Sequence, residues 1–98
     1  MTIGKHRDGS ALTLAPEGRL DTITSPELEK VFKESLDGVS ELTLDFGKLD
    51  YISSAGLRVL LAAQKTMSRQ GSMTLRHVNE IISEIFEVTG FADILTIE

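Results

Sequence analysis

The sequence contains no cysteine and no tryptophan, and its aromatic residues are one tyrosine and four phenylalanines. Without cysteine, disulfide bonds and thiolate metal sites are excluded. Because aromatic side chains are scarce, the core is expected to consist mostly of Leu, Ile, Val and Ala. The two histidines, His6 and His77, are far apart in the chain and lack a neighbouring ligand pattern. We therefore expect no metal site.

Long apolar runs are also missing. No stretch approaches the roughly 18 apolar residues that a membrane span needs. The N-terminal sequence MTIGKHRDGS has no apolar segment of the kind found in signal peptides. We therefore expect no membrane insertion and a cytoplasmic location.

The chain has no excess of positive charge: 10 basic residues face 15 acidic ones, for a net charge of −5. Binding to nucleic acid or to anionic lipid needs a Lys/Arg surface, so neither is an expected partner. Hydrophobic residues make up 41% and charged residues 26%, an ordinary balance for a globular protein. A length of 98 residues predicts a single domain over 1–98. The acidic charge balance is compatible with a protein as the partner.

The first 20 residues are typical of a β-hairpin. Asp8-Gly9 is a favoured two-residue turn, because both residues tolerate a positive φ. The second strand, about residues 11–17, alternates at Leu12 and Leu14, and Pro16 indicates that its end is an edge or a bulge.

The segment 25–38 predicts the first helix. Ser25 is a candidate cap, Pro26 suits the first helical position, and Gly38 ends the pattern. Its apolar stripe consists of Leu28, Val31, Phe32 and Leu36.

The remaining chain alternates strands and helices. Strands are predicted over 41–46, 72–78 and 92–98, and helices over 54–71 and 79–90, the last with Asn79 as its cap and Gly90 as its end. In the longest helix, Leu57, Leu60 and Leu61 share one face. The order β-β-α-β-α-β-α-β predicts an α/β fold whose mixed sheet is packed against helices through right-handed crossovers.

The stretch DYISSAGLRVLL, residues 50–61, places two serines where a strand meets a helix. One interpretation is a nucleophile, but the G-x-S-x-G pattern would need glycine where Ile52 stands. A serine nucleophile also needs a base, and His77 has no evident partner in the sequence. We therefore do not expect an enzyme.

Two other interpretations stay open. Ser53 or Ser54 is a helix cap with no further role, or one of them is a regulated phosphoacceptor. A helix N-terminus accommodates phosphate because its free N–H groups and its dipole favour an anion. No phosphate-binding glycine motif is present, so no nucleotide or other cofactor is expected.

The stretch LTLDFGKLDYISSAGLRVLL resembles the signature of STAS domains, in particular the bacterial anti-sigma factor antagonists. PEGRLDTITSPELE resembles the family's second element, and HVNEIISEIFEVTGFADILTI resembles its closing helix and strand. The resemblance implies a partner-switching protein. Its unphosphorylated form binds an anti-sigma factor, often a serine kinase, and so releases a sigma factor. Phosphorylation ends this binding and a phosphatase restores it.

The family's phosphorylated position falls on Ser54, with Ser53 as the alternative acceptor. The resemblance further implies a partner-binding surface that consists of Asp21, Asp50, Ser53, Ala55, Gly56 and Arg58. In this surface Gly56 is expected to let a partner backbone approach, because it has no Cβ.

A different role is implied by other members that resemble this chain. Stand-alone STAS proteins also serve as cytoplasmic accessory subunits of ABC-type lipid transport complexes. In that case the same helix face meets an ATPase subunit.

Overall fold

A mixed six-stranded β-sheet forms the centre of the computed structural model, which describes all residues, 1–98. Its main path runs in the order β1-β2-β3-β5-β6, and β4 pairs separately with β2. The β1–β2 pairing is antiparallel and the other pairings are parallel. The strands are β1 (Thr2–Asp8), β2 (Ala11–Leu20), β3 (Glu41–Asp45), β4 (Leu49–Ile52), β5 (Ser72–Arg76) and β6 (Thr96–Ile97).

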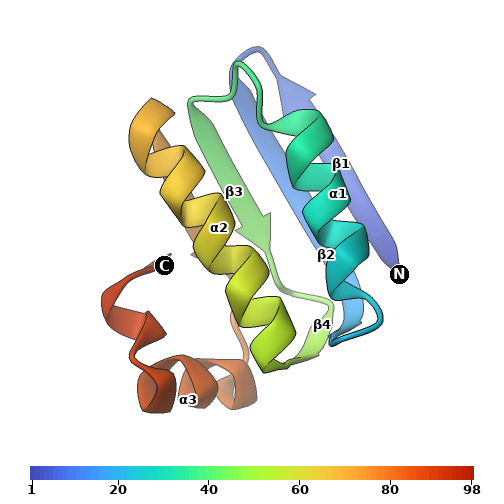
Figure 1. Cartoon of the computed structure of the whole chain (residues 1–98), viewed down its shortest axis with the longest axis vertical. Helices are drawn as coiled ribbons and strands as arrows, with labels where there is room; N and C mark the ends of the chain where they lie inside the picture. The colour runs from blue at the N-terminus through green and yellow to red at the C-terminus, as the bar shows by residue number, and fades with distance from the viewer.

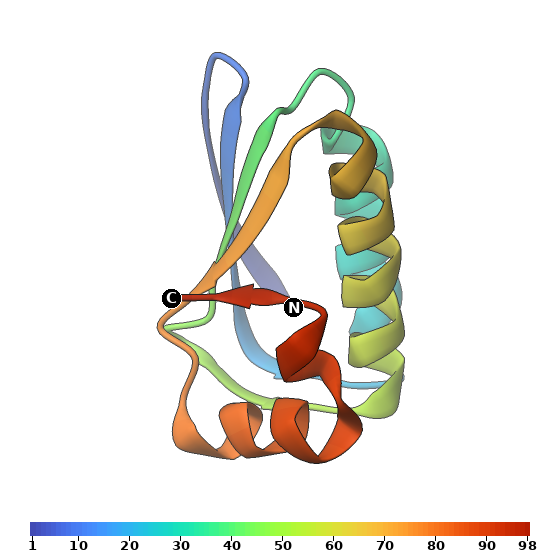
Figure 2. The ribbon, with the colours of Figure 1, turned by 90° about the vertical axis from the view of Figure 1, so that its left-hand side faces the viewer.

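Three α-helices complete the fold: α1 (Ser25–Ser35), α2 (Ser54–Gln70) and α3 (Glu80–Thr89). A short 3₁₀ turn, Phe91–Asp93, connects α3 to β6. Helices α1 and α2 lie side by side over one face of the sheet (Figure 1), whereas α3 lies across one end, next to β4 (Figure 2). The α/β class and the mixed sheet predicted from the sequence are confirmed. None of the helices is long and apolar enough to cross a membrane.

Strand β4 is absent from the predicted order of elements. It is only four residues long and lacks regular alternation, because Leu49 and Ile52 are the buried positions. Strand β2 is longer than predicted and continues to Leu20 so that it can pair with both β3 and β4.

The sequence predicted that the second strand ends near Pro16 as an edge or a bulge, but β2 continues through Pro16, which pairs with Ile3 in regular register, and the irregularity lies at Gly18/Arg19. Residues 11–14 of β2 pair with β3, and residues 18–20 pair with β4, with a register shift between Gly18 and Arg19. Pro16, which has no N–H to donate, lies in the interval between the two parallel partners. The ends of β2 and β4 therefore form a small parallel pair of their own.

Two local predictions are wrong by one residue. Asp8 pairs with Ala11, so the hairpin turn is Gly9-Ser10 rather than Asp8-Gly9. Gly9 has φ +62°, which suits the first position of a type II′ turn. Thr24, not Ser25, occupies the N-cap position of α1, and the Ser25 side chain is buried without a hydrogen-bond partner.

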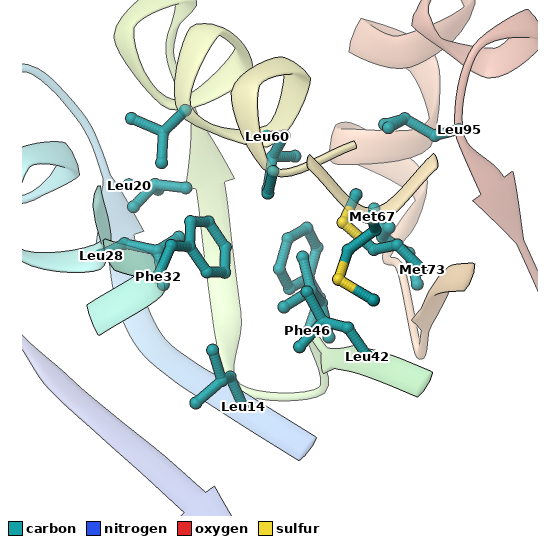
Figure 3. Packing of buried hydrophobic residues seen from close by; sticks show 14 of the residues in the cluster. Leu14, Leu20, Leu28, Phe32, Leu42, Phe46, Leu60, Met67, Met73 and Leu95 are labelled. Atoms are coloured by element: carbon teal, nitrogen blue, oxygen red, sulfur yellow. The ribbon is translucent and has the colours of Figure 1, made fainter. Parts of the chain in front are cut away.

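The core is a single cluster of buried hydrophobic side chains between the sheet and the helices (Figure 3). Leucine dominates it, as the composition predicted, and Phe46 and Phe86 are its largest fully buried members. Leu57 and Leu60 are buried as predicted, whereas Leu61 is only half-buried. The cap of α3 is confirmed, because Asn79 Oδ1 accepts from Ile82 N at 2.8 Å. Gly90 ends that helix with φ +81°.

Candidate functional site

The two serines lie where β4 ends and α2 begins. Because β2 and β4 are parallel and Leu20 pairs with Ile52, both strands end at the same place. The backbone N–H of Ser53 donates to the carbonyl of Leu20 at 2.8 Å. The loop that follows β2, beginning at Asp21, therefore starts beside the N-terminus of α2.

The structure distinguishes Ser53 from Ser54. Ser53 is the N-cap residue with extended backbone (φ −98°, ψ 177°), and its carbonyl accepts from Leu57 N at 3.0 Å. Its hydroxyl oxygen is shielded and has no hydrogen-bond partner. Ser54 is the first helical residue and is exposed. Neither side chain caps α2 by a hydrogen bond, contrary to the cap interpretation, and only the Ser54 side chain is open to another protein.

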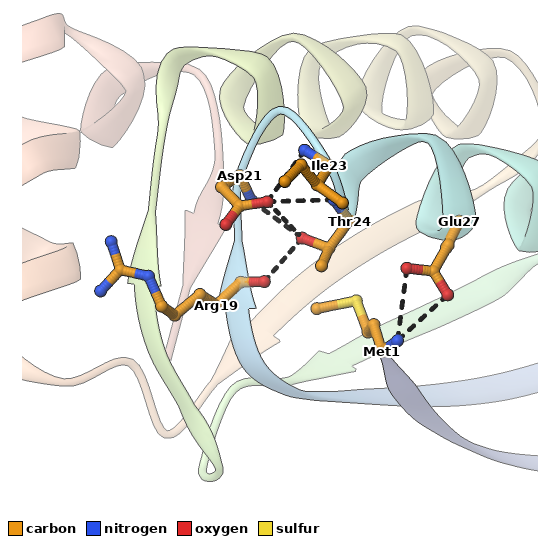
Figure 4. Close-up of polar contacts among 6 residues, drawn as sticks. All are labelled: Met1, Arg19, Asp21, Ile23, Thr24 and Glu27. Atoms are coloured by element: carbon orange, nitrogen blue, oxygen red, sulfur yellow. Dashed lines mark hydrogen bonds and ion pairs between the residues drawn. The ribbon is translucent and has the colours of Figure 1, made fainter.

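Asp21 organises the loop between β2 and α1 (Figure 4). Its Oδ1 accepts from the backbone N–H of Ile23 at 2.9 Å and of Thr24 at 3.0 Å. In return, the backbone N–H of Asp21 donates to Thr24 Oγ1 at 2.9 Å, and the Thr24 hydroxyl donates to the Arg19 carbonyl at 2.6 Å. The backbone N–H of Thr24 is the main cause that holds the pKa of the Asp21 carboxyl below its ordinary value. This loop, which begins beside the N-terminus of α2, thus holds a negative charge in a fixed position.

The charge of Asp21 is expected to give a pH-dependent contribution to stability. Because the folded pKa lies below the unfolded value, the contribution is fully present above about pH 5 and is lost as the pH falls through the folded pKa. Asp21→Asn keeps an oxygen acceptor in the same place but removes the charge. We expect wild type to be more stable than Asp21→Asn at pH 7, and the difference to shrink at about pH 3 and below.

Urea unfolding of both proteins at a series of pH values measures this effect. A difference that stays constant between pH 7 and the acid limit would show that the carboxylate charge contributes nothing. The hydrogen bonds of the loop would then act through geometry alone.

The other expected contact residues have different surroundings. Asp50 is exposed on β4, and its neighbour Tyr51 lies under the Arg19 guanidinium, whose carbon is 4.6 Å from the ring centroid. Ala55 and Arg58 line a shallow hollow between the starts of α1 and α2, together with Thr22 of the Asp21 loop. Asp21's loop and the first turns of α2 therefore contribute to one continuous surface.

The role expected for Gly56 is corrected by the structure. Gly56 is buried and faces the sheet. A Cβ at this position would lie 2.7 Å from Ile52 Cγ1 and 2.9 Å from Leu20 Cγ. Its missing side chain lets α2 approach the ends of β2 and β4, and does not open a surface to a partner.

His77 does have a partner, which the sequence did not reveal. Its Nδ1 lies 2.9 Å from Asp45 Oδ1, and it follows β5 with a left-handed backbone (φ +58°). This pair lines a separate hollow with Glu17 and Lys48, and it makes no hydrogen bond to either serine. The spacing of residues 45 and 77 in the sequence gives no signal of the contact, because it depends on the parallel pairing of β3 with β5.

Comparisons with known proteins agree with this architecture. A family model described as "Mlab, STAS domain" matches residues 3–96. The protein BtrV of Bordetella bronchiseptica is 36% identical over 83% of this chain and 72% of its own length. The anti-sigma-B factor antagonist of Listeria monocytogenes is 28% identical over 96% of this chain and 84% of its own length.

Solved structures share the fold at lower identity. An anti-sigma factor antagonist from Mycobacterium paratuberculosis has a TM-score of 0.87 at 18% identity, and the match covers 98% of this chain and 83% of that one. The Bacillus protein SpoIIAA in its phosphorylated form has a TM-score of 0.76 at 13% identity, with 99% and 91% covered. The family match, which spans nearly the whole sequence, shows that the chain belongs to the STAS domain family.

Proposed function

We propose that this chain is an anti-sigma factor antagonist, whose unphosphorylated form binds an anti-sigma factor and so releases a sigma factor. The relatives support this assignment, since the Listeria protein that matches 96% of the chain is an anti-sigma-B factor antagonist. The chain acts as a binding module and as the substrate of a kinase, and it performs no catalysis itself.

The observation that carries the proposal is the exposure of Ser54 at the first position of α2, beside the loop of Asp21. A kinase, in this proposal the anti-sigma factor itself, transfers the γ-phosphoryl group of ATP to Ser54 Oγ. ADP and the hydroxyl proton are released. The added charge of about −1.5 to −2 at pH 7 appears near the ionised Asp21. The surface then repels a partner that fitted it before, until a phosphatase removes the phosphate.

Charge at position 54 is expected to control partner binding. Ser54→Ala should bind the cognate anti-sigma factor as wild type does, whereas Ser54→Asp should bind at least about tenfold more weakly, about 1.4 kcal/mol. Isothermal titration calorimetry with the purified partner measures both. Ser68→Asp is the matched control, because it adds the same charge to an exposed position near the other end of α2.

Equal affinity of Ser54→Asp and wild type would contradict charge control. If wild type binds no anti-sigma factor but does bind the ATPase subunit of an ABC-type lipid transporter, the alternative role applies.

Incubation with the kinase and ATP, followed by mass spectrometry of Ser53→Ala and Ser54→Ala, identifies the serine that accepts the phosphate. Phosphate on Ser54→Ala but not on Ser53→Ala would assign the modification to Ser53.

A further inference from the structure

Arg58 lies one helical turn after Ser54 on α2, and both side chains are exposed. Residues four apart in a helix are neighbours on its surface. Helical side chains also lean toward the N-terminus, which brings the first turn of α2 within reach of the Arg58 side chain. No acidic residue is present in this first turn.

The guanidinium of Arg58 is not engaged elsewhere in the molecule. The four ion pairs of the structure join Met1 to Glu27, Lys33 to Glu29, Arg76 to Glu98 and His77 to Asp45. Glu29, which lines the same hollow as Arg58, is thus paired with Lys33 at 3.6 Å. The other cation near the ends of β2 and β4, Arg19, is stacked on Tyr51.

We propose that, in the phosphorylated protein, Arg58 binds the phosphate of Ser54 within the same chain and holds it over the first turn of α2. This inference rests on the proposed modification of Ser54. A planar guanidinium donates two parallel hydrogen bonds to phosphate oxygens, and such charge-assisted pairs are stronger than neutral ones. The free N–H groups at the start of α2 favour the same anion position.

This pairing changes what phosphorylation does to the surface. The modification adds an anion, and it also withdraws Arg58 from any contact with a partner carboxylate. A partner that binds the unphosphorylated chain through Arg58 therefore loses its attraction to the guanidinium, and it is also repelled by the phosphate. Asp21 and Arg58 form no ion pair in the structure.

The test uses protein with phosphoserine incorporated at position 54 during translation, so that no kinase is required. The second pKa of the phosphate is followed by ³¹P NMR in wild type, Arg58→Gln, Arg58→Lys and Arg69→Gln. Arg69 is the matched control, since it is exposed on the same helix, about 22 Å along the helix axis from Ser54. Circular dichroism of the four proteins confirms that each is folded.

We expect Arg58→Gln to raise the phosphate pKa by about 0.3 unit, which corresponds to the strength of an exposed helical ion pair. Arg58→Lys should restore part of the shift and Arg69→Gln should leave the pKa unchanged. Equal pKa values in wild type and Arg58→Gln, or an equal shift in Arg69→Gln, would overturn the inference. That result leaves the effect of Ser54→Asp on partner binding untouched, so the two proposals fail separately.

Discussion

Gly71→Ala is expected to destabilise the protein by about 3–4 kcal/mol. Gly71 follows α2, and a Cβ there would lie 1.8 Å from the carbonyl oxygen of Ser40 and 2.6 Å from its carbonyl carbon. These are backbone atoms, so no side-chain rotation relieves the clash. Its φ of 170° is an extended value, and the glycine is therefore required by space and not by backbone strain.

Ser40 cannot move aside without loss of other bonds. Its N–H donates to the Ser10 carbonyl at 2.9 Å, and its carbonyl accepts from Ser72 N at 2.9 Å. Its hydroxyl also donates to Ser10 Oγ at 3.0 Å. A shift of Ser40 would therefore disturb the β1–β2 turn and the start of β5 together.

Urea unfolding measures this prediction, with Gly4→Ala as the matched control. A Cβ at Gly4 would lie 3.5 Å from Ala15 Cβ, an ordinary contact, so this variant should change stability by less than about 1 kcal/mol. If Gly71→Ala and Gly4→Ala unfold at the same urea concentration, the α2–β5 junction tolerates a backbone shift that we do not expect.

Phe86→Ala is expected to cost about 3–5 kcal/mol, because it removes a fully buried ring and leaves a cavity. Phe86 is the largest buried side chain of α3, the helix that packs against β4. Phe86 and Ile82 are the two buried side chains by which α3 packs on the rest of the fold.

Val88→Ala serves as the control on the same helix, since Val88 is 81% exposed and should change stability by less than about 0.5 kcal/mol. Both variants are compared with wild type by thermal and urea unfolding. A loss below about 1 kcal/mol for Phe86→Ala would mean that α3 contributes little to the cooperative core.

Most of the fold follows from local patterns in the sequence. The alternation of Leu42 and Leu44 in β3, and the cap and stop of α3 at Asn79 and Gly90, are local signals that the structure confirms. Strand β4 is not predicted because its four residues, of which the first and last are buried, show neither the two-residue period of a strand nor the 3.6-residue period of a helix. Its pairing partner, β2, also lies some 30 residues earlier along the chain. Non-local pairing also hides the contact between Asp45 and His77.

The candidate site was predictable in position but not in detail. The pattern of residues 50–61 located the serines at a strand–helix junction, and the family resemblance gave a reason to choose Ser54. Which serine is exposed depends on how Ser53 joins the end of β2, and this follows only from the three-dimensional pairing. The inward orientation of Gly56 likewise depends on Leu20 and Ile52, which local sequence does not bring together.

The division of β2 between two parallel partners has a consequence for how this domain tolerates changes in chain length. Residues 11–14 set the alignment with β3, whereas residues 18–20 set the alignment with β4. An insertion or deletion at 15–17 would leave the pairing of Leu12 and Leu14 with β3 in place, and it would change how β2 aligns with the first residues of β1 and with β4. A change of length in this short interval would therefore alter the strand ends beside the start of α2, together with the start of β1, while β2 and β3 stay aligned.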